Sequence, residues 1–244
     1  MSGLPKDRDA YGHGLLDFLQ GDASTEVVER DDGLIEPDVG PSGYFAPYRS
    51  WPAMEKSAMR FVRGRVLDVG AGAGRVALHL QEHGHDVVAI DNSPLAIKTC
   101  LLRGVKDARV VPFTQMSSKL GVFDSIVMFG NNFGLFGSYE RARWMLRRMK
   151  KLTSADARIV TETLDPYQTE MPEHLAYHRR NRKLGRMAGQ LKIRVRYLAY
   201  ATPWFDYLFV SQPEMRKIAT GTGWHVTQVF EDLPRYVAVI EKEA

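Results

Sequence analysis

The sequence predicts an α/β fold in which helices cover a mostly parallel sheet, and three observations support this. A short apolar run that ends in Asp68 leads into a glycine-rich turn and a helical segment at 76–80. A second buried-type strand follows at 86–90, and a continuous apolar run lies at 123–129. Such runs, alternating with helical segments, are typical of parallel strands that are covered on both faces.

The turn after the first strand is the most informative stretch of the chain. It places three glycines in alternation with small residues, as Gly70-Ala71-Gly72-Ala73-Gly74. Glycine is required where φ is positive or where the backbone must approach a ligand closely. The turn also directs N–H groups and the positive end of the next helix above the strand. We therefore expect a polar or anionic part of a nucleotide-like ligand to bind here.

Two classes of cofactor use a turn of this kind. Residues 72–77 fit the G-x-G-x-x-G/A pattern of dinucleotide-binding proteins, although Arg75 takes the third small position if Gly70 is counted first. The acidic Asp68, two residues before Gly70, is the better discriminator. With it, the stretch 68–74 resembles motif I of the class I S-adenosylmethionine-dependent methyltransferases, in which the loop contacts the methionine part of the cofactor.

The end of the second strand strengthens this resemblance. Asp91 lies 21 residues after Gly70, where a carboxylate can accept both ribose hydroxyls in either cofactor class. The stretch 91–94 also resembles the D-x-S-P pattern of the methyltransferases. The same residues fit a helix start, with Ser93 as the cap and Pro94 in the first turn.

The resemblance implies a Rossmann-like, doubly wound, mostly parallel sheet of seven strands with a C-terminal antiparallel strand. It covers about residues 60–164 and 211–242, and a closing hairpin at 224–240 matches the last two strands of the family. Residues 1–60 are expected to form a helical and hairpin arm or lid before a core at 61–244.

Residues 166–210 are too long for a simple crossover after the fifth strand at 157–164. Alternation of apolar and basic residues at 191–200, and a turn at 202–204, predict an inserted antiparallel hairpin that returns at 205–210.

The resemblance also implies which residues bind S-adenosylmethionine. Many family members hold an acid against the adenine amine, but residues 114–118 contain none, so either the Gln115 side-chain oxygen or backbone groups are expected to replace it. The expected cofactor-binding residues are Asp68, Gly70, Ala71, Gly72, Gly74, Asp91, Asn92, Gln115, Met116, Phe129 and Asn131.

The residues expected to contact the methyl acceptor or to take a proton from it lie at the ends of the fourth and fifth strands. Asn131 and Asn132 come directly after the fourth strand and would contact cofactor or substrate, although Asn and Gly also suit a plain turn. Glu162 and Asp165 lie near the carboxyl end of the fifth strand. Either would take a proton from a substrate hydroxyl or amine, or else serve as a cap or ion pair.

Arg194 and Arg196 in the insert are the remaining candidates for substrate binding. A guanidinium there would hold a carboxylate or phosphate, and the alternative is a solvated strand face. No metal is expected, because His174 and His178 are four residues apart without a nearby third ligand.

Charge is unevenly distributed although the net charge is only +4. Residues 1–40 hold ten acids against three bases, whereas 141–151 hold six bases and 178–196 hold eight, both without acids. Either the acidic arm lies against the basic segments, or these segments bind an acidic ligand or nucleic acid.

The sequence contains a single cysteine, no apolar run of about 18 residues and no N-terminal signal pattern, so we expect a cytoplasmic protein without membrane contact. The expected activity is methyl transfer from S-adenosylmethionine to an N or O nucleophile of a small molecule. The alternatives are an RNA methyltransferase, a non-catalytic cofactor-binding partner protein and a nicotinamide-dependent oxidoreductase.

Overall fold

The computed structural model describes residues 3–22, 25–37 and 40–243, so small parts of the predicted arm at 1–60 lie outside the described residues. A seven-stranded sheet has the order β11-β12-β7-β6-β3-β4-β5. Strand β12 runs antiparallel to both β7 and β11, whereas β3, β4 and β5 run parallel to one another. The predicted α/β class, seven strands and antiparallel C-terminal strand are thus confirmed. The chain divides into two compact units, which we describe separately.

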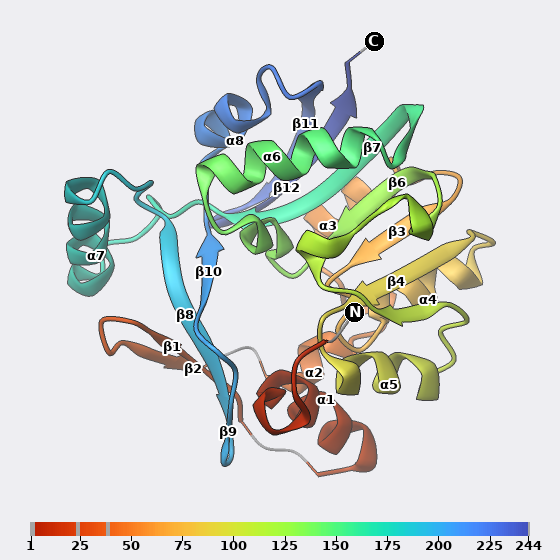
Figure 1. Cartoon of the computed structure of the whole chain (residues 1–244), viewed down its shortest axis with the longest axis horizontal. Helices are drawn as coiled ribbons and strands as arrows, with labels where there is room; N and C mark the ends of the chain where they lie inside the picture. Colours follow the sequence, from red (N-terminus) through yellow and green to blue (C-terminus); the bar gives the residue numbers. More distant parts are fainter. Residues whose placement is uncertain (1–2, 23–24, 38–39, 244) are drawn as a thin grey trace. The chain divides into compact units, whose positions relative to one another are not determined.

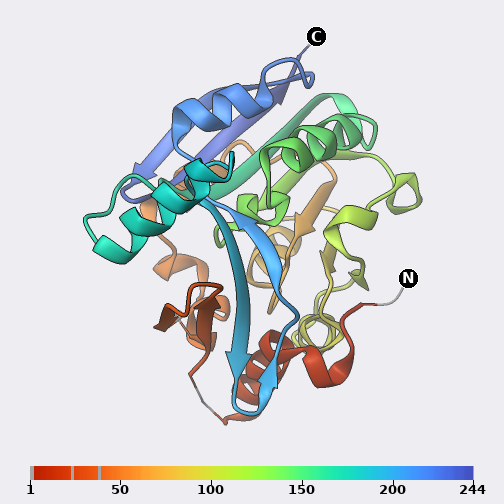
Figure 2. The ribbon, with the colours of Figure 1, turned by 60° about the vertical axis from the view of Figure 1, so that its left-hand side comes forward.

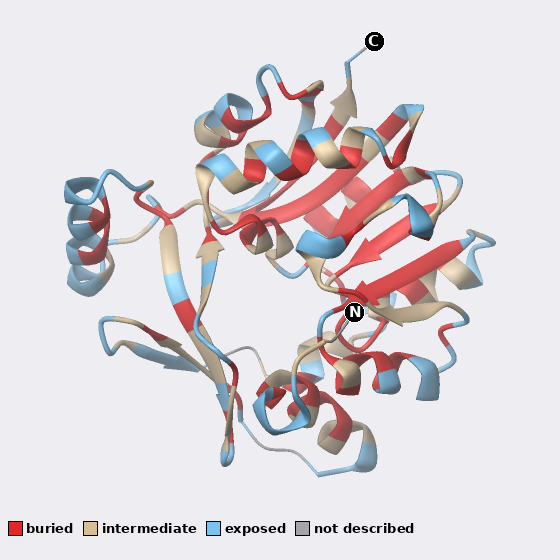
Figure 3. Ribbon diagram, viewed as in Figure 1, coloured by how far each residue is buried: buried red, intermediate tan, exposed pale blue. Residues whose placement is uncertain are grey.

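The first unit comprises residues 1–51, 64–120 and 193–204. Its parallel strands alternate with two helices, and β3 and β4 are buried along their whole length (Figure 3). Such strands need apolar residues on both faces, which explains their continuous apolar runs. The elements are β3 (Val66–Val69), α4 (Arg75–Glu82), β4 (Val87–Asp91), α5 (Pro94–Leu102) and β5 (Ala108–Val110), followed by the short 3-10 helices η3 (Phe113–Gln115) and η4 (Ser118–Leu120).

The arm belongs to this first unit, and its α1 packs against α5 (Figure 1). The arm comprises η1 (Lys6–Arg8), α1 (Ala10–Gln20), β1 (Val27–Arg30), β2 (Ile35–Pro37), α2 (Pro41–Tyr44) and η2 (Tyr48–Ser50). Strands β1 and β2 form the antiparallel hairpin expected from the sequence. On its other edge, β1 pairs with β8 (Gln190–Tyr197) of the insert, with Glu29 opposite Arg194.

The insert differs from the expected hairpin in the position of its turn. Strand β8 ends at Tyr197, and β9 (Tyr200–Ala201) already pairs back with it, Tyr197 opposite Tyr200. Leu198 makes this turn in a left-handed conformation, with φ of 49°. The turn predicted at 202–204 is therefore placed too late, because nothing in the sequence marks a leucine for positive φ.

The second unit comprises residues 52–63, 121–192 and 205–244. Strand β6 pairs in parallel with β7, and β7 pairs with β12. The sequence did not identify α7, because its residues are mostly polar. The elements are α3 (Ala53–Met59), β6 (Phe123–Met128), η5 (Asn132–Phe136), α6 (Tyr139–Lys150), β7 (Thr153–Leu164), α7 (Pro172–Lys183), β10 (Phe205–Leu208), α8 (Gln212–Ala219), β11 (Trp224–Asp232) and β12 (Arg235–Lys242).

Two helices of this unit begin at a capping serine. The Ser138 hydroxyl accepts a hydrogen bond from the N–H of Arg141 and caps α6. Ser211 and Glu214 form a capping box at α8. Among the residues that the structure describes, no helix has the length and apolar character needed to cross a bilayer.

Candidate functional site

The glycine loop between β3 and α4 requires glycine at all three positions. Gly70, Gly72 and Gly74 have φ values of 70°, 54° and 78°, which side-chain-bearing residues rarely adopt. Ala71 and Ala73 between them are buried. This sequence of small residues therefore folds into a tight turn directly after Val69, the last residue of β3.

Four N–H groups of this loop already donate to oxygens of the chain itself. Those of Gly70 and Ala71 reach the Ile90 carbonyl at 2.9 and 3.1 Å, and that of Gly74 reaches the Ala71 carbonyl at 2.8 Å. The N–H of Gly72 donates to Oδ2 of Asp91 at 3.1 Å. A loop that cradles phosphate needs its N–H groups for the ligand, so this one is poorly suited to a pyrophosphate.

Asp91 ends β4 beside this loop and is buried. Its Oδ1 accepts the Ser93 N–H at 2.9 Å, and its Oδ2 accepts from Gly72. Burial raises its pKa to about 6, against the lowering effect of these backbone hydrogen bonds. A carboxylate has about four acceptor positions, so two remain for a pair of hydroxyls.

Asp68 lies one strand away and is also buried. Burial raises its pKa to about 7, although the charge of Arg75 opposes the shift. Its Oδ2 has no hydrogen-bond partner within the described ranges 3–22, 25–37 and 40–243. A buried acceptor of this kind favours a ligand that brings a hydrogen-bond donor.

The other predicted cofactor residues of this unit differ in exposure. Asn92 is exposed, and its carbonyl accepts the N–H of Leu4 from the arm at 2.9 Å. Gln115 is exposed on η3, whereas Met116 is fully buried. An exposed amide at Gln115 is free to turn toward an adenine, whereas Met116 offers only an apolar contact or its backbone.

The arm reaches the same loops through Asp9, a residue that the sequence analysis did not single out. Asp9 is fully buried, and its Oδ2 accepts from the Ser93 hydroxyl at 2.8 Å and from the Leu95 N–H at 3.1 Å. A Cβ added at Gly72 would come within 2.7 Å of the Tyr11 hydroxyl. The only sequence signal for Asp9 was its position before an amphipathic helix, which is typical of an N-cap.

In the second unit, the loop after β6 holds the predicted Asn131 in a left-handed conformation with φ of 61°. Its carbonyl accepts the Tyr207 hydroxyl at 2.6 Å and the Gly134 N–H at 2.8 Å. Its Oδ1 is buried without a hydrogen-bond partner in the described part of the chain. Asn132 follows as the first residue of η5 and is half-buried, and Phe129 before the loop is buried. No local pattern in the sequence pointed to Tyr207.

The two acid candidates at the carboxyl end of β7 are held differently. Glu162 is 1% exposed, and its Oε2 accepts the Gly130 N–H at 2.6 Å while Oε1 lies 3.7 Å from the Arg235 guanidinium. Asp165 is half-buried, and its Oδ1 accepts the Tyr167 N–H at 2.9 Å. Glu162 thus fixes the loop after β6, whereas Asp165 retains an oxygen toward a pocket.

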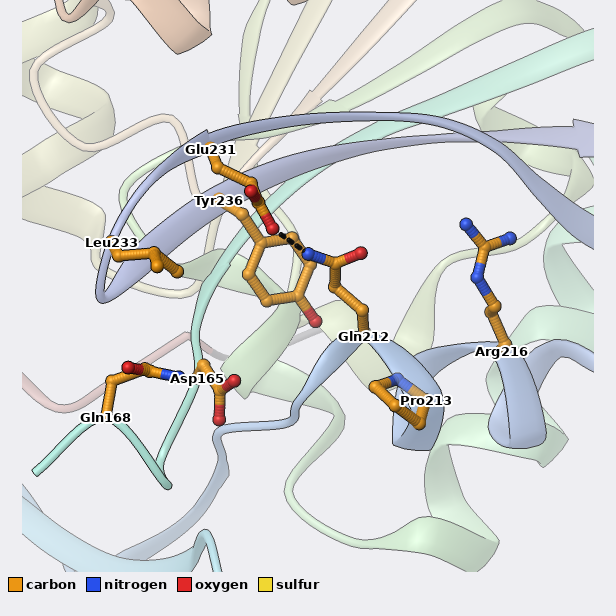
Figure 4. A pocket seen from close by; sticks show the side chains of 8 residues that line it. All are labelled: Asp165, Gln168, Gln212, Pro213, Arg216, Glu231, Leu233 and Tyr236. Carbon is orange, nitrogen blue, oxygen red and sulfur yellow. Dashed lines mark hydrogen bonds between the residues drawn. The ribbon is translucent and has the colours of Figure 1, made fainter.

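That pocket has a volume of about 410 Å³ and carries charges of both signs (Figure 4). Asp165 and Glu231 contribute carboxylates, Arg216 a guanidinium and Tyr236 a ring whose hydroxyl donates to the Val210 carbonyl. Figure 4 shows Gln212 hydrogen-bonded to Glu231 at its edge. Residues from the end of β7, the start of α8 and the β11–β12 turn therefore meet here.

The two predicted substrate arginines bind a carboxylate of the chain itself. Arg194 contacts Glu29 through two hydrogen bonds, of 2.8 and 3.1 Å, and Arg196 adds a third at 3.2 Å. The Arg194 guanidinium holds the pKa of Glu29 below its usual range, and Arg196 adds to this. The acidic arm thus lies against the basic insert here. Within the described residues, no cluster of three or more His, Cys, Asp or Glu suits a metal ion.

Residues 66–156 match the sequence model of a family described as a methyltransferase domain. Among solved structures, an S-adenosylmethionine-dependent methyltransferase from Bacteroides fragilis, in complex with S-adenosyl-L-homocysteine, is 29% identical with a TM-score of 0.83. The match covers 100% of this chain and 98% of that one. No curated protein sequence matches.

Two further solved structures share the fold at lower identity. The CcbJ methyltransferase of Streptomyces caelestis is 15% identical with a TM-score of 0.59, over 81% of this chain and 95% of its own. The 1,6-didemethyltoxoflavin-N1-methyltransferase of Burkholderia thailandensis is 16% identical with a TM-score of 0.53, over 81% of each chain.

Proposed function

We propose that this chain, a class I S-adenosylmethionine-dependent methyltransferase, transfers the sulfonium methyl group of S-adenosylmethionine to a nitrogen or oxygen of a small molecule. The acceptor's lone pair forms a bond to the methyl carbon as the bond between that carbon and the sulfonium sulfur breaks. S-Adenosylhomocysteine leaves, and the acceptor then loses a proton if it carried one. Because the cofactor brings its own leaving group, the protein's main contribution is alignment of the two reactants.

One observation carries the assignment of the cofactor residues, namely the buried Asp91 at the end of β4, tied to the Gly72 N–H. We assign Asp91 to the ribose hydroxyls, and Gly70, Gly72 and Gly74 to the shape of the loop around the methionine part. The unpaired Oδ2 of Asp68 suits the cofactor's ammonium or a water bound to it. The occupied N–H groups of the loop favour this assignment over a dinucleotide.

The choice of a small-molecule acceptor rests on the basic residues. Arg143 of α6 donates to the carbonyls of Ile218 and Thr220, and Arg148 stacks over Trp144. Arg194 is held by Glu29. Arginines that are bound to the chain itself are less available for a phosphate backbone. The toxoflavin-type acceptor of the Burkholderia thailandensis structure, a small molecule methylated at N1, supports the same choice.

On the acceptor side, we assign Asn131 and Asn132 to contacts with the substrate or the reacting end of the cofactor. Asp165 is the better candidate for a proton acceptor, because Glu162 is already bonded to Gly130. A base is needed only where the acceptor must lose its proton before or during methyl transfer.

The first test is calorimetric titration with S-adenosylhomocysteine beside NADH, in the wild type and in Asp91→Ala. We expect the first ligand alone to bind, and Asp91→Ala to weaken it about 100-fold, since two charge-assisted hydrogen bonds are lost. Unchanged affinity in the variant would remove Asp91 from the ribose site.

The second test uses S-adenosylmethionine with a labelled methyl group and two acceptor pools from one cell extract. One pool holds molecules below about 3 kDa and the other holds purified RNA. We expect label to enter the first pool. Label confined to RNA, with a steep salt dependence of binding, would replace this proposal with the RNA methyltransferase.

A further inference from the structure

Asp9 joins the N-terminal arm to the loop that follows β4. Its carboxylate is fully buried and accepts three hydrogen bonds. Oδ1 accepts the Gly12 N–H at 3.1 Å and so caps α1. Oδ2 accepts the Ser93 hydroxyl at 2.8 Å and the Leu95 N–H at 3.1 Å, at the start of α5. One side chain therefore caps two helices that are more than 80 residues apart in the sequence.

A continuous chain of hydrogen bonds runs from Asp9 to the glycine loop. The Ser93 hydroxyl that donates to Asp9 also accepts the Ala96 N–H at 2.9 Å. The Ser93 N–H donates to Asp91, which in turn accepts from Gly72. The position of the Asp91 carboxylate is thus set from one side by the loop and from the other by the arm.

Apolar packing brings the arm to the same place. Leu15 of α1, Ala73 of the glycine loop and Ala96 of α5 form one buried cluster. Tyr11 and Tyr44 pack against this cluster from the arm, with their rings edge to face at 5.1 Å. The Tyr11 hydroxyl lies over Gly72, as the 2.7 Å approach to an added Cβ shows.

The far side of α1 is also held. The Tyr197 hydroxyl of β8 donates to Asp17 at 3.0 Å, and His13 stacks on Tyr200 of β9 at 3.7 Å. Figure 2 shows the tip of this hairpin beside the first helices. Helix α1 is thus bound on two sides. Because Asp9 joins it to Ser93, a displacement of α1 would also displace the loop that holds Ser93 and Asp91.

We propose that Asp9 is a positioning residue for cofactor binding: by capping α1 and α5 together, it couples docking of the arm to the geometry of Asp91. This rests on the proposed role of Asp91 in holding the ribose. Coupling between two sites is reciprocal, so the bound cofactor stabilises the docked arm to the same extent that the docked arm strengthens cofactor binding.

The variant Asp9→Asn separates this role from helix capping. Asn caps a helix about as well as Asp does, so α1 keeps the bond from Gly12. The amide nitrogen that then replaces Oδ2 cannot accept a hydrogen bond, so the bonds from the Ser93 hydroxyl and the Leu95 N–H at the start of α5 are lost. The matched control is Ser138→Ala, which removes the cap of α6 in the other unit.

Calorimetry with S-adenosylhomocysteine is the first readout. We expect Asp9→Asn to bind about tenfold more weakly than the wild type, within the usual range of coupling between sites. Its KM for S-adenosylmethionine rises while kcat at saturation stays near that of the wild type. Ser138→Ala lowers the Tm without a change in affinity. Wild-type affinity in Asp9→Asn would overturn the proposal, whereas a wild type that binds no S-adenosylhomocysteine would overturn the proposed function instead.

Hydrogen exchange of the wild-type protein supplies a readout that needs no variant. We expect S-adenosylhomocysteine to slow amide exchange across residues 10–20, because the cofactor and the arm stabilise each other. An arm whose exchange is the same with and without S-adenosylhomocysteine, in a protein that binds it, would contradict the coupling.

Discussion

The loops around Asp91 and the loop after β6 are built in opposite ways. In the first unit, the oxygens of Asp9 and Asp91 accept N–H or O–H donors from Ser93 and Gly72, and three glycines relieve the backbone of strain. In the second unit, a non-glycine residue, Asn131, holds positive φ and buries an oxygen without a partner among the described residues. The loop that we propose for the cofactor is thus bonded internally, whereas the loop that we propose for the methyl acceptor keeps a strained residue and a spare hydrogen-bond acceptor.

Under the proposed roles of the two loops, a cofactor and a methyl acceptor place different demands on the loop that meets each of them. A loop that meets a fixed ligand can be stabilised by the chain in advance. A loop that meets a particular acceptor must retain polar atoms for it, at some loss of stability.

The largest expected effect concerns the buried acids of the first unit. The pKa of Asp91 is about 6 in the folded protein, above its ordinary value of 3.8, so the folded state binds this proton more tightly. Its contribution to stability is full below pH 4 and is lost as the pH rises through 6. Relative to Asp91→Asn, the wild type should lose on the order of 3 kcal/mol of unfolding free energy between pH 4 and 7.

Urea unfolding of both proteins at several pH values measures this difference. Parallel stability curves for the wild type and Asp91→Asn would show that Asp91 does not titrate as its burial suggests. Cofactor affinity should have the opposite pH dependence, because the ionised carboxylate accepts the ribose hydroxyls, and it should weaken below about pH 6.

A glycine comparison tests whether the loop of the first unit is shaped for a ligand or only for the turn. Gly72→Ala places a Cβ at φ of 54° and within 2.7 Å of the Tyr11 hydroxyl. Gly84→Ala has a similar φ of 85° but no neighbour within 4 Å. Both should lose about 1 to 2 kcal/mol from left-handed strain.

Only Gly72→Ala should also weaken binding of S-adenosylhomocysteine, by about tenfold, because Tyr11 and the arm must move. Calorimetry and thermal unfolding of the two variants provide the measurement. Equal binding by both would mean that the contact between the arm and the loop is irrelevant to the cofactor.

The smallest expected effect concerns the second unit. Tyr207→Phe removes the hydroxyl that bonds the Asn131 carbonyl, and Tyr236→Phe removes a similar bond to the Val210 carbonyl. Each should lower stability by about 1 kcal/mol. Only Tyr207→Phe should reduce the rate of methyl transfer, with unchanged cofactor affinity. Equal rates in both variants would show that the strained Asn131 does not act in the reaction.

Sequence reasoning reached the first unit's loops because their chemistry is local. Gly70, Gly72 and Gly74 need positive φ within five residues, and Asp91 ends a strand whose apolar run is plain in the sequence. The mostly parallel sheet of seven strands and the antiparallel β12 followed from the same local patterns together with the resemblance to a family.

What sequence reasoning missed depends on contacts between distant segments. Asp9 meets Ser93 and Tyr207 meets Asn131, each across more than 70 residues. The uneven charge had left open that the acidic arm lies against the basic segments, but it did not indicate that Glu29 is the acid that pairs with Arg194. The positive φ of Leu198 was equally invisible, because leucine carries no preference for it. Periodicity and capping rules describe neighbours in the chain, so they cannot identify such pairs.

The pairing of β1 with β8 also determines when the arm can be secured during synthesis. Glu29 and Arg194 are separated by 165 residues. Tyr197, whose hydroxyl donates to Asp17 of α1, is synthesised after Arg194. The glycine loop and β4 leave the ribosome long before this strand does. Because such distant contacts form slowly, the nascent chain should form its parallel strands first and close the arm only when residues 193–201 have emerged.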